Sequence, residues 1–150
     1  VISKAKIQSA FEFGLFRRNS NAKGTINKTG RILKMVNDLV RLGLHNYYTK
    51  DASFFVCVAD SFMLKHRLNC QIYEPFPAMK YTVSINEIEN LRNKVKTDKF
   101  FDDRFMEKAR EINMSVIAEL IHESVIEAKT LEHETKILIW RIGQKTKKQF

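Results

Sequence analysis

The stretch between positions 17 and 31, RRNSNAKGTINKTGR, has the residue types best suited to binding a charged partner. It holds five Lys or Arg residues and no Asp or Glu. Clustered positive charge of this kind is typical of contacts with phosphate groups. It is not a nucleotide-hydrolysing P-loop, because that motif places a glycine directly before its Lys-Thr pair. Here Asn27 precedes Lys28 and Thr29. We also interpret the segment before the stretch as a helix, whereas a P-loop follows a strand.

The same positive charge continues along the next predicted element, a helix over residues 26–46. Apolar residues recur there at intervals of three and four, and the opposite face is basic. The first turn of a helix offers unpaired N–H groups and the positive end of a dipole, which suits a phosphate. For any single residue, an ordinary solvated surface is the alternative interpretation. We predict that seven residues contact nucleic acid: Arg17, Arg18, Lys23, Lys28, Arg31, Lys34 and Arg41.

The overall charge agrees with an anionic partner. The chain of 150 residues has a formal net charge of +9, and its first third carries most of the excess. We therefore expect a non-enzymatic domain that binds RNA or single strands through the phosphate backbone. Tyr47 and Tyr48 are candidates for stacking on bases. No motif for a cofactor is present, so we expect none.

A second hypothesis is a secreted basic helical-bundle protein that acts on a receptor or an anionic cell surface. The chain starts at Val1 without Met, which suits a processed product. We nevertheless favour an intracellular, reducing location, because a helix would hold Cys57 and Cys70 about 20 Å apart, too far for a disulfide. A Cys57–Cys70 bond, or sugar on Asn27, would favour the secreted alternative. No run of 18 apolar residues predicts a membrane span.

Two further groups of residues resemble parts of metal sites. Glu119 and His122 have the Glu-x-x-His spacing of di-iron bundles, but such sites need a second copy of the motif. Cys57, His66 and Cys70 lack the CxxC-like knuckle of structural zinc sites. We predict no metal site and no catalytic residue.

These residues are expected to sit on a mainly α fold. The counts of Gly 5 and Pro 2 leave few turn signals, which favours helices. We predict a single domain over 1–150, built as a compact bundle of five or six helices, with room for one small β-hairpin near 70–84. The run SFFVCV could also form a buried strand, because periodicity alone does not separate the two. The expected helices span about 3–17, 26–46, 52–68, 84–95, 98–112 and 114–143.

Two local signals refine this expectation. Ser84 and Glu87 have the spacing of a capping box, which predicts that a helix begins there. Between residues 117 and 142, apolar and small residues recur at alternating intervals of four and three, as in a coiled-coil seam. A helix with this seam would pack within the bundle or pair two copies as a homodimer.

Overall fold

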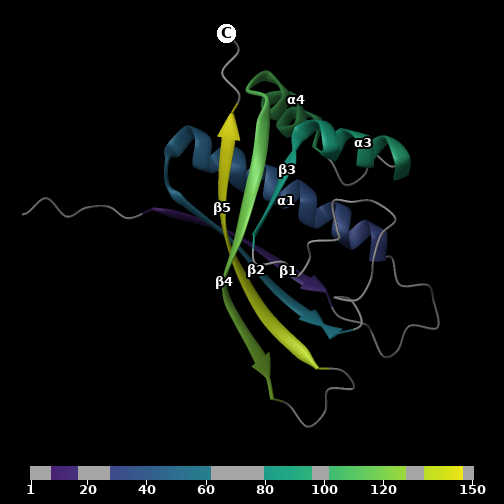
Figure 1. Cartoon of the computed structure of the whole chain (residues 1–150), viewed down its shortest axis with the longest axis vertical. Coiled ribbons are helices and arrows are strands. Elements are labelled where there is room, and N and C mark those ends of the chain that lie inside the picture. The colour runs from purple at the N-terminus through teal and green to yellow at the C-terminus, as the bar shows by residue number, and fades with distance from the viewer. Residues whose placement is uncertain (1–7, 17–27, 62–79, 96–101, 128–133, 147–150) are drawn as a thin grey trace, which may run out of the picture.

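The chain folds as a mixed α/β structure, which corrects the predicted helical bundle. The computed structural model describes residues 8–16, 28–61, 80–95, 102–127 and 134–146. Within these ranges it contains helices α1, α3 and α4 and a five-stranded sheet with strand order β1-β2-β5-β4-β3 (Figure 1). The prediction of a mainly α fold is therefore wrong, because three predicted helices are strands.

The first half of the sheet is a parallel crossover unit. Strand β1 (Ser9–Phe16) leads through helix α1 (Lys28–Thr49) to strand β2 (Ala52–Asp60). The two strands pair in parallel from Ser9 opposite Ala52 to Phe16 opposite Ala59. Such a connection needs a long crossover rather than a tight turn. This explains why low glycine and proline content did not exclude a sheet.

The second half of the sheet is antiparallel. Strand β5 (Thr135–Thr146) lies between β2 and β4 (Met114–Ile126), and β4 pairs with the short strand β3 (Lys80–Ser84). A register shift between Leu120 and His122 interrupts the pairing of β4 with β5. The last strand in the chain is thus a central strand of the sheet.

Helix α1 packs on one face of this sheet and forms the core with it. Met35, Val36 and Leu39, which belong to the apolar stripe of α1, are buried. They pack against every second residue of the strands β2 and β5, because successive side chains of a strand point to opposite faces of the sheet. The largest fully buried strand residues are Trp140, Phe55, Met114, Leu138 and Ile142, and the ring centroids of Phe55 and Trp140 lie 6.2 Å apart.

The opposite face of β1 is apolar and exposed. Phe11, Phe13 and Leu15 are 52%, 69% and 64% exposed, whereas the residues between them are partly buried. The Phe11 ring stacks on Phe54 of β2 at 5.2 Å. This two-residue alternation is the strand signature that the helical interpretation of residues 3–17 overlooked.

The two shorter helices connect β3 to β4. Helix α3 (Ile85–Val95) begins at the predicted capping box, which is confirmed. Glu87 accepts hydrogen bonds from the backbone N–H and the hydroxyl of Ser84, both at 2.7 Å. Helix α4 (Asp103–Glu111) begins after Asp102, whose side chain accepts from the Arg104 N–H at 3.0 Å. The hydrogen bonds from Arg104 also lower the pKa of the Asp102 carboxyl.

The helix predicted for 52–68 is wrong over 52–60, where the alternative of a buried strand is confirmed. The helix predicted for 114–143 is wrong because residues 114–126 and 135–146 form β4 and β5, so the helical homodimer seam over 117–142 does not exist. Strand β3 pairs with β4, and residues 70–79 of the proposed hairpin lie outside the described ranges.

No described helix is both long enough and apolar enough to cross a membrane. The prediction of a single domain is not tested and stays a prediction.

Candidate functional site

The seven predicted contact residues fall into three groups. Arg17, Arg18 and Lys23 lie outside the described residues. Lys28 and Arg31 occupy the first turns of α1, where the structure describes the backbone but not the side chains. Only Lys34 and Arg41 can be judged by their contacts. Both make ion pairs with carboxylates of the same chain.

Asp38 is the centre of this ion-pair cluster. Its side chain is only 3% exposed and lies 3.0 Å from the Lys34 ammonium and 3.5 Å from the Arg41 guanidinium. The spacing of four and three residues places all three side chains on one face of α1. Because a buried carboxylate needs compensating charge, Lys34 and Arg41 already serve a structural role.

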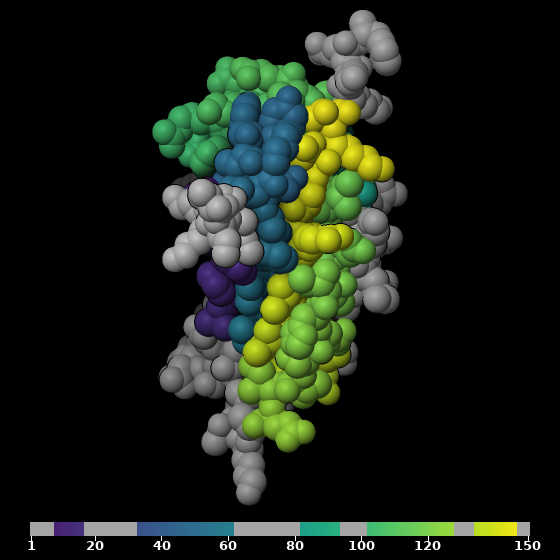
Figure 2. All heavy atoms as spheres, turned by 90° about the vertical axis from the view of Figure 1, so that its left-hand side faces the viewer, coloured from purple at the N-terminus to yellow at the C-terminus, as the bar shows by residue number. Residues whose placement is uncertain are grey.

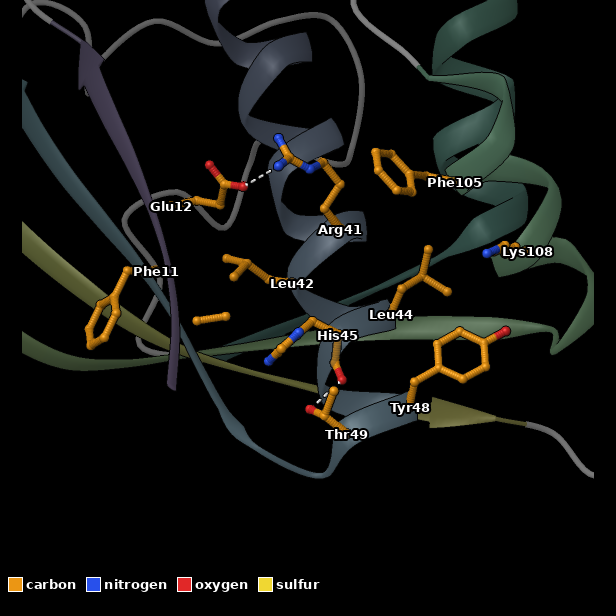
Figure 3. Close-up of a pocket in the computed structure, with 11 residues that line it drawn as sticks. Phe11, Glu12, Arg41, Leu42, Leu44, His45, Tyr48, Thr49, Phe105 and Lys108 are labelled. Carbon is orange, nitrogen blue, oxygen red and sulfur yellow. Dashed lines mark hydrogen bonds and ion pairs between the residues drawn. The ribbon is translucent and has the colours of Figure 1, made fainter. Parts of the chain in front are cut away.

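Arg41 also connects α1 to two other elements. Its guanidinium lies 2.8 Å from the carboxylate of Glu12 in β1 and 5.5 Å from the ring centroid of Phe105 in α4 (Figure 3). A guanidinium over an aromatic ring at this distance is a cation–π contact. Arg41 therefore holds together β1, α1 and α4.

The described residues carry no net charge. Of 26 Lys and Arg residues and 17 Asp and Glu residues in the chain, 14 of each sign lie in the described ranges. The remaining 12 basic and 3 acidic residues therefore account for the whole formal net charge of +9. Excess positive charge thus belongs to the segments between and beyond the described elements, and not to the sheet and its helices.

A groove of about 390 Å³ lies beside the Arg41 cluster, between β1, α1 and α4. Figure 2 shows the helical segment containing α1 beside α4 at one end of the molecule. The groove combines apolar and polar groups. The ring of Phe11 lies on the far side of β1 in Figure 3, so the groove presents mainly the side chains of Glu12, Arg41, His45, Tyr48, Phe105 and Lys108.

His45 lines this groove near the C-terminal end of α1. Its Nε2 is 3.7 Å from the Asp51 carboxylate, just after α1. Asp51 belongs to the connection from α1 into β2, where the Asn46 side chain donates a hydrogen bond to the Asp51 carbonyl at 2.9 Å. The contacts of His45 and Asn46 with Asp51 therefore join the end of α1 to the start of β2.

The thiol of Cys57 is too deeply buried to act as a nucleophile or as a metal ligand. Cys57 is fully buried in β2, is not in a disulfide, and has its pKa raised by burial to about 12. A thiol in such a setting is inert as a nucleophile and as a metal ligand. His66 and Cys70, the other members of the zinc hypothesis, lie outside the described residues.

The Glu-x-x-His pattern is on a strand and not on a helix. Glu119 lies 3.0 Å from the Arg141 guanidinium, and His122 is within 3.2 Å of the Ser124 hydroxyl. Glu119 thus makes an ion pair from β4 to β5, and His122 contacts a hydroxyl within β4. In the described part of the chain, no three His, Cys, Asp or Glu side chains converge as a metal site.

Comparisons with protein-family models, with curated proteins and with solved structures find no match to this chain. The function must therefore be argued from the residues themselves.

Sequence reasoning missed Glu12, Phe105 and Lys108 as neighbours of Arg41. Glu12 comes from β1, and Phe105 and Lys108 both come from α4, so no local spacing connects them to Arg41 in α1. The one available signal was Glu12 itself, a single carboxylate within the apolar run AFEFGLF. A charge in such a run requires a partner.

Proposed function

We propose that this chain is a non-enzymatic module that binds nucleic acid, preferentially RNA or single strands, through contacts with the phosphate backbone. The observation that carries the proposal is the distribution of charge. The described residues are balanced, whereas residues 17–27 hold three basic residues and no acidic one, and Lys28 and Arg31 continue this charge into the first turns of α1. Positive charge on a segment joined to a neutral body is suited to contacts with phosphates.

The position of residues 17–31 in the fold adds support. Residues 17–27 connect the end of β1 to the start of α1, where Lys28 and Arg31 lie, and Figure 1 shows the first turn of α1 on the same side as the arrowheads of β1 and β2. In open α/β sheets, ligands bind outside the carboxyl ends of the parallel strands. The N-terminus of α1 at this edge favours an anion.

The proposed contact set is narrower than the predicted one. Arg17, Arg18, Lys23, Lys28 and Arg31 remain in it. Lys34 and Arg41 are assigned instead to the ion-pair cluster around Asp38, since moving either to a phosphate would remove charge from that buried carboxylate.

The test is the affinity for a labelled single-stranded RNA, measured by fluorescence anisotropy between about 50 and 200 mM salt. We expect affinity to fall steeply with salt. The double variant Arg17→Gln/Arg18→Gln should flatten the slope of log K against log salt by about 1.4, or about 0.7 for each lost contact with a single strand.

The matched control is Arg141→Gln/Lys145→Gln, which removes the same charge from exposed positions of β5. Both residues alternate along β5 with Trp140 and Ile142, which are buried under α1, so they lie on the other face of the sheet. This variant should bind as the unmodified chain does. Absence of binding at low salt, or equal weakening by both double variants, would refute the proposal.

A further inference from the structure

The groove between β1, α1 and α4 is lined by both aromatic and basic side chains. On α1, Arg41, His45 and Tyr48 follow one another at intervals of four and three, so their side chains share one face of the helix. On α4, Phe105 and Lys108 are three residues apart and share a face in the same way. The two faces meet at the groove (Figure 3).

Tyr48 offers an aromatic surface to solvent. It is 58% exposed, although aromatic side chains of this size usually bury most of their area. Tyr47 contacts it edge-on, with ring centroids 5.0 Å apart and planes at 82°. The Phe105 ring, by contrast, has the Arg41 guanidinium over it. Tyr48 is therefore the ring of this groove that is open to a planar ligand.

Lys108 is the cation of this groove that no described carboxylate engages. The other two basic residues of α4 are paired within the described ranges, Arg104 with Asp102 at 2.9 Å and Arg110 with Glu89 at 2.5 Å. Glu12, the carboxylate in the groove wall, is already paired with Arg41. The unpaired charge of the groove among the described side chains is thus positive.

We infer that this groove binds one nucleotide of a single strand, with its base on the Tyr48 ring and its phosphate on the Lys108 ammonium. A base supplies the planar face and a phosphate the negative charge within a single residue of the ligand. The groove volume of about 390 Å³ falls in the range of small-ligand sites. This inference rests on the proposed function and assigns it a second contact region, distinct from residues 17–31.

The groove lies well along α1 from that first region. Tyr48 follows Lys28 by 20 residues, or about 30 Å of helix. A single strand that binds both regions at once must therefore span this distance with several of its nucleotides. This geometry predicts that affinity rises with the length of the strand until both regions are covered.

The experiment measures binding of single-stranded RNA and, separately, of adenosine monophosphate, adenosine and inorganic phosphate by NMR titration. We expect adenosine monophosphate to bind more tightly than either of its two parts. Tyr48→Ala should weaken RNA binding by about five-fold to more than a hundred-fold, the range for losing one stacked base. Lys108→Gln should weaken RNA and adenosine monophosphate but leave adenosine unchanged.

Arg104→Gln is the matched control, because Arg104 lies on the same helix but is paired with Asp102. It should leave all four affinities unchanged. Thermal melting of each variant confirms folding, which these exposed side chains should not disturb.

The outcomes separate the two proposals. If RNA binds and neither Tyr48→Ala nor Lys108→Gln changes its affinity, the groove assignment is overturned while the proposed function stands. If adenosine monophosphate binds and is weakened by both substitutions but RNA does not bind, the groove is supported as a nucleotide site and the proposed function fails. If adenosine monophosphate binds no more tightly than phosphate alone, the inference is overturned.

Discussion

The buried thiol of Cys57 makes the stability of this fold depend on pH in a way that can be measured. Burial raises the pKa of the thiol from an ordinary value of 9.0 to about 12. The unfolded chain therefore loses this proton at lower pH than the folded chain. The contribution of Cys57 to the free energy of unfolding is fully present below pH 9 and is lost as pH rises from 9 towards 12.

The size of the effect follows from the shift. Between these two pKa values the free energy of unfolding should fall by about 1.4 kcal/mol for each pH unit because of this one group. Tyrosine and lysine side chains also titrate in this range, so the informative quantity is a difference between two proteins. Cys57→Ala removes the thiol at a pH-independent cost of about 1 kcal/mol for the lost buried atom.

The assay is urea unfolding between about pH 8 and pH 10.5, followed by the fluorescence of Trp140. This is the one tryptophan of the chain, and it is buried in the core beside Phe55. Both proteins carry Cys70→Ala, so that the second thiol does not contribute. The unmodified Cys57 protein should be the more stable one at pH 8, and its advantage should shrink and reverse as pH rises.

Parallel stability curves for the two proteins would refute this reasoning, because they would mean that Cys57 ionises equally in the folded and unfolded chains. Such a result would also contradict the assignment of β2, in which Cys57 faces the core and its neighbours Val56 and Val58 face the other way. Slow alkylation of Cys57 in the folded protein provides an independent check.

Substitutions at four other positions have expected effects on the free energy of unfolding, each measured by urea denaturation. Glu87→Ala removes the capping box of α3 and should cost about 1 kcal/mol; no loss would mean that solvent replaces the cap. Gly14→Ala should cost about 1–3 kcal/mol, because its new methyl carbon would lie 2.8 Å from the Phe55 ring unless that ring moves. Gly143→Thr has open space and a strand backbone, so it should be neutral or stabilise by up to about 1 kcal/mol; a clear loss would contradict the open face of β5. Asn113 has a φ of 45°, so Asn113→Val should cost about 1–2 kcal/mol while Asn113→Gly is tolerated.

Local signals predicted α1 and α3, whereas strand pairing was not predictable from them. The apolar stripe of α1 and the Ser84–Glu87 capping box involve residues within one or two turns of each other. The strands depend on distant partners, such as Phe55 of β2 opposite Trp140 of β5. Because β4 and β5 also contain apolar residues at intervals of three and four, their spacing matched a helix by coincidence.

β-branched residues were the better guide in this region. The segments SVIAELIHESVI and KILIWRI are rich in Ile and Val, which favour strands. In KILIWRI, buried residues alternate with less buried ones from Leu138 to Ile142. The length of the apolar pattern predicts one long helix, whereas its composition favours the two strands that the structure contains.

The candidate site was predictable in part. Arg41 was selected for its charge, but its role depends on Glu12 and Phe105, which approach it only in the folded chain. Tyr48 was selected as a stacking candidate and is an exposed ring. Lys108 belongs to a helix with near-balanced charge, so nothing in its local sequence distinguishes it from Arg104 and Arg110.

The place of β5 in the sheet determines when this protein can fold during synthesis. Residues 135–146 form a strand that pairs with both β2 and β4. Until these residues are made, the crossover unit of β1, α1 and β2 lacks the strand that pairs with the second edge of β2, and β4 has only β3 beside it. Because β5 pairs with residues far away in the sequence, the nascent chain exposes the apolar residues that pack on β5 until residues 135–146 are made. A chaperone that binds extended apolar segments should therefore retain chains truncated before residue 135 and release those that include β5.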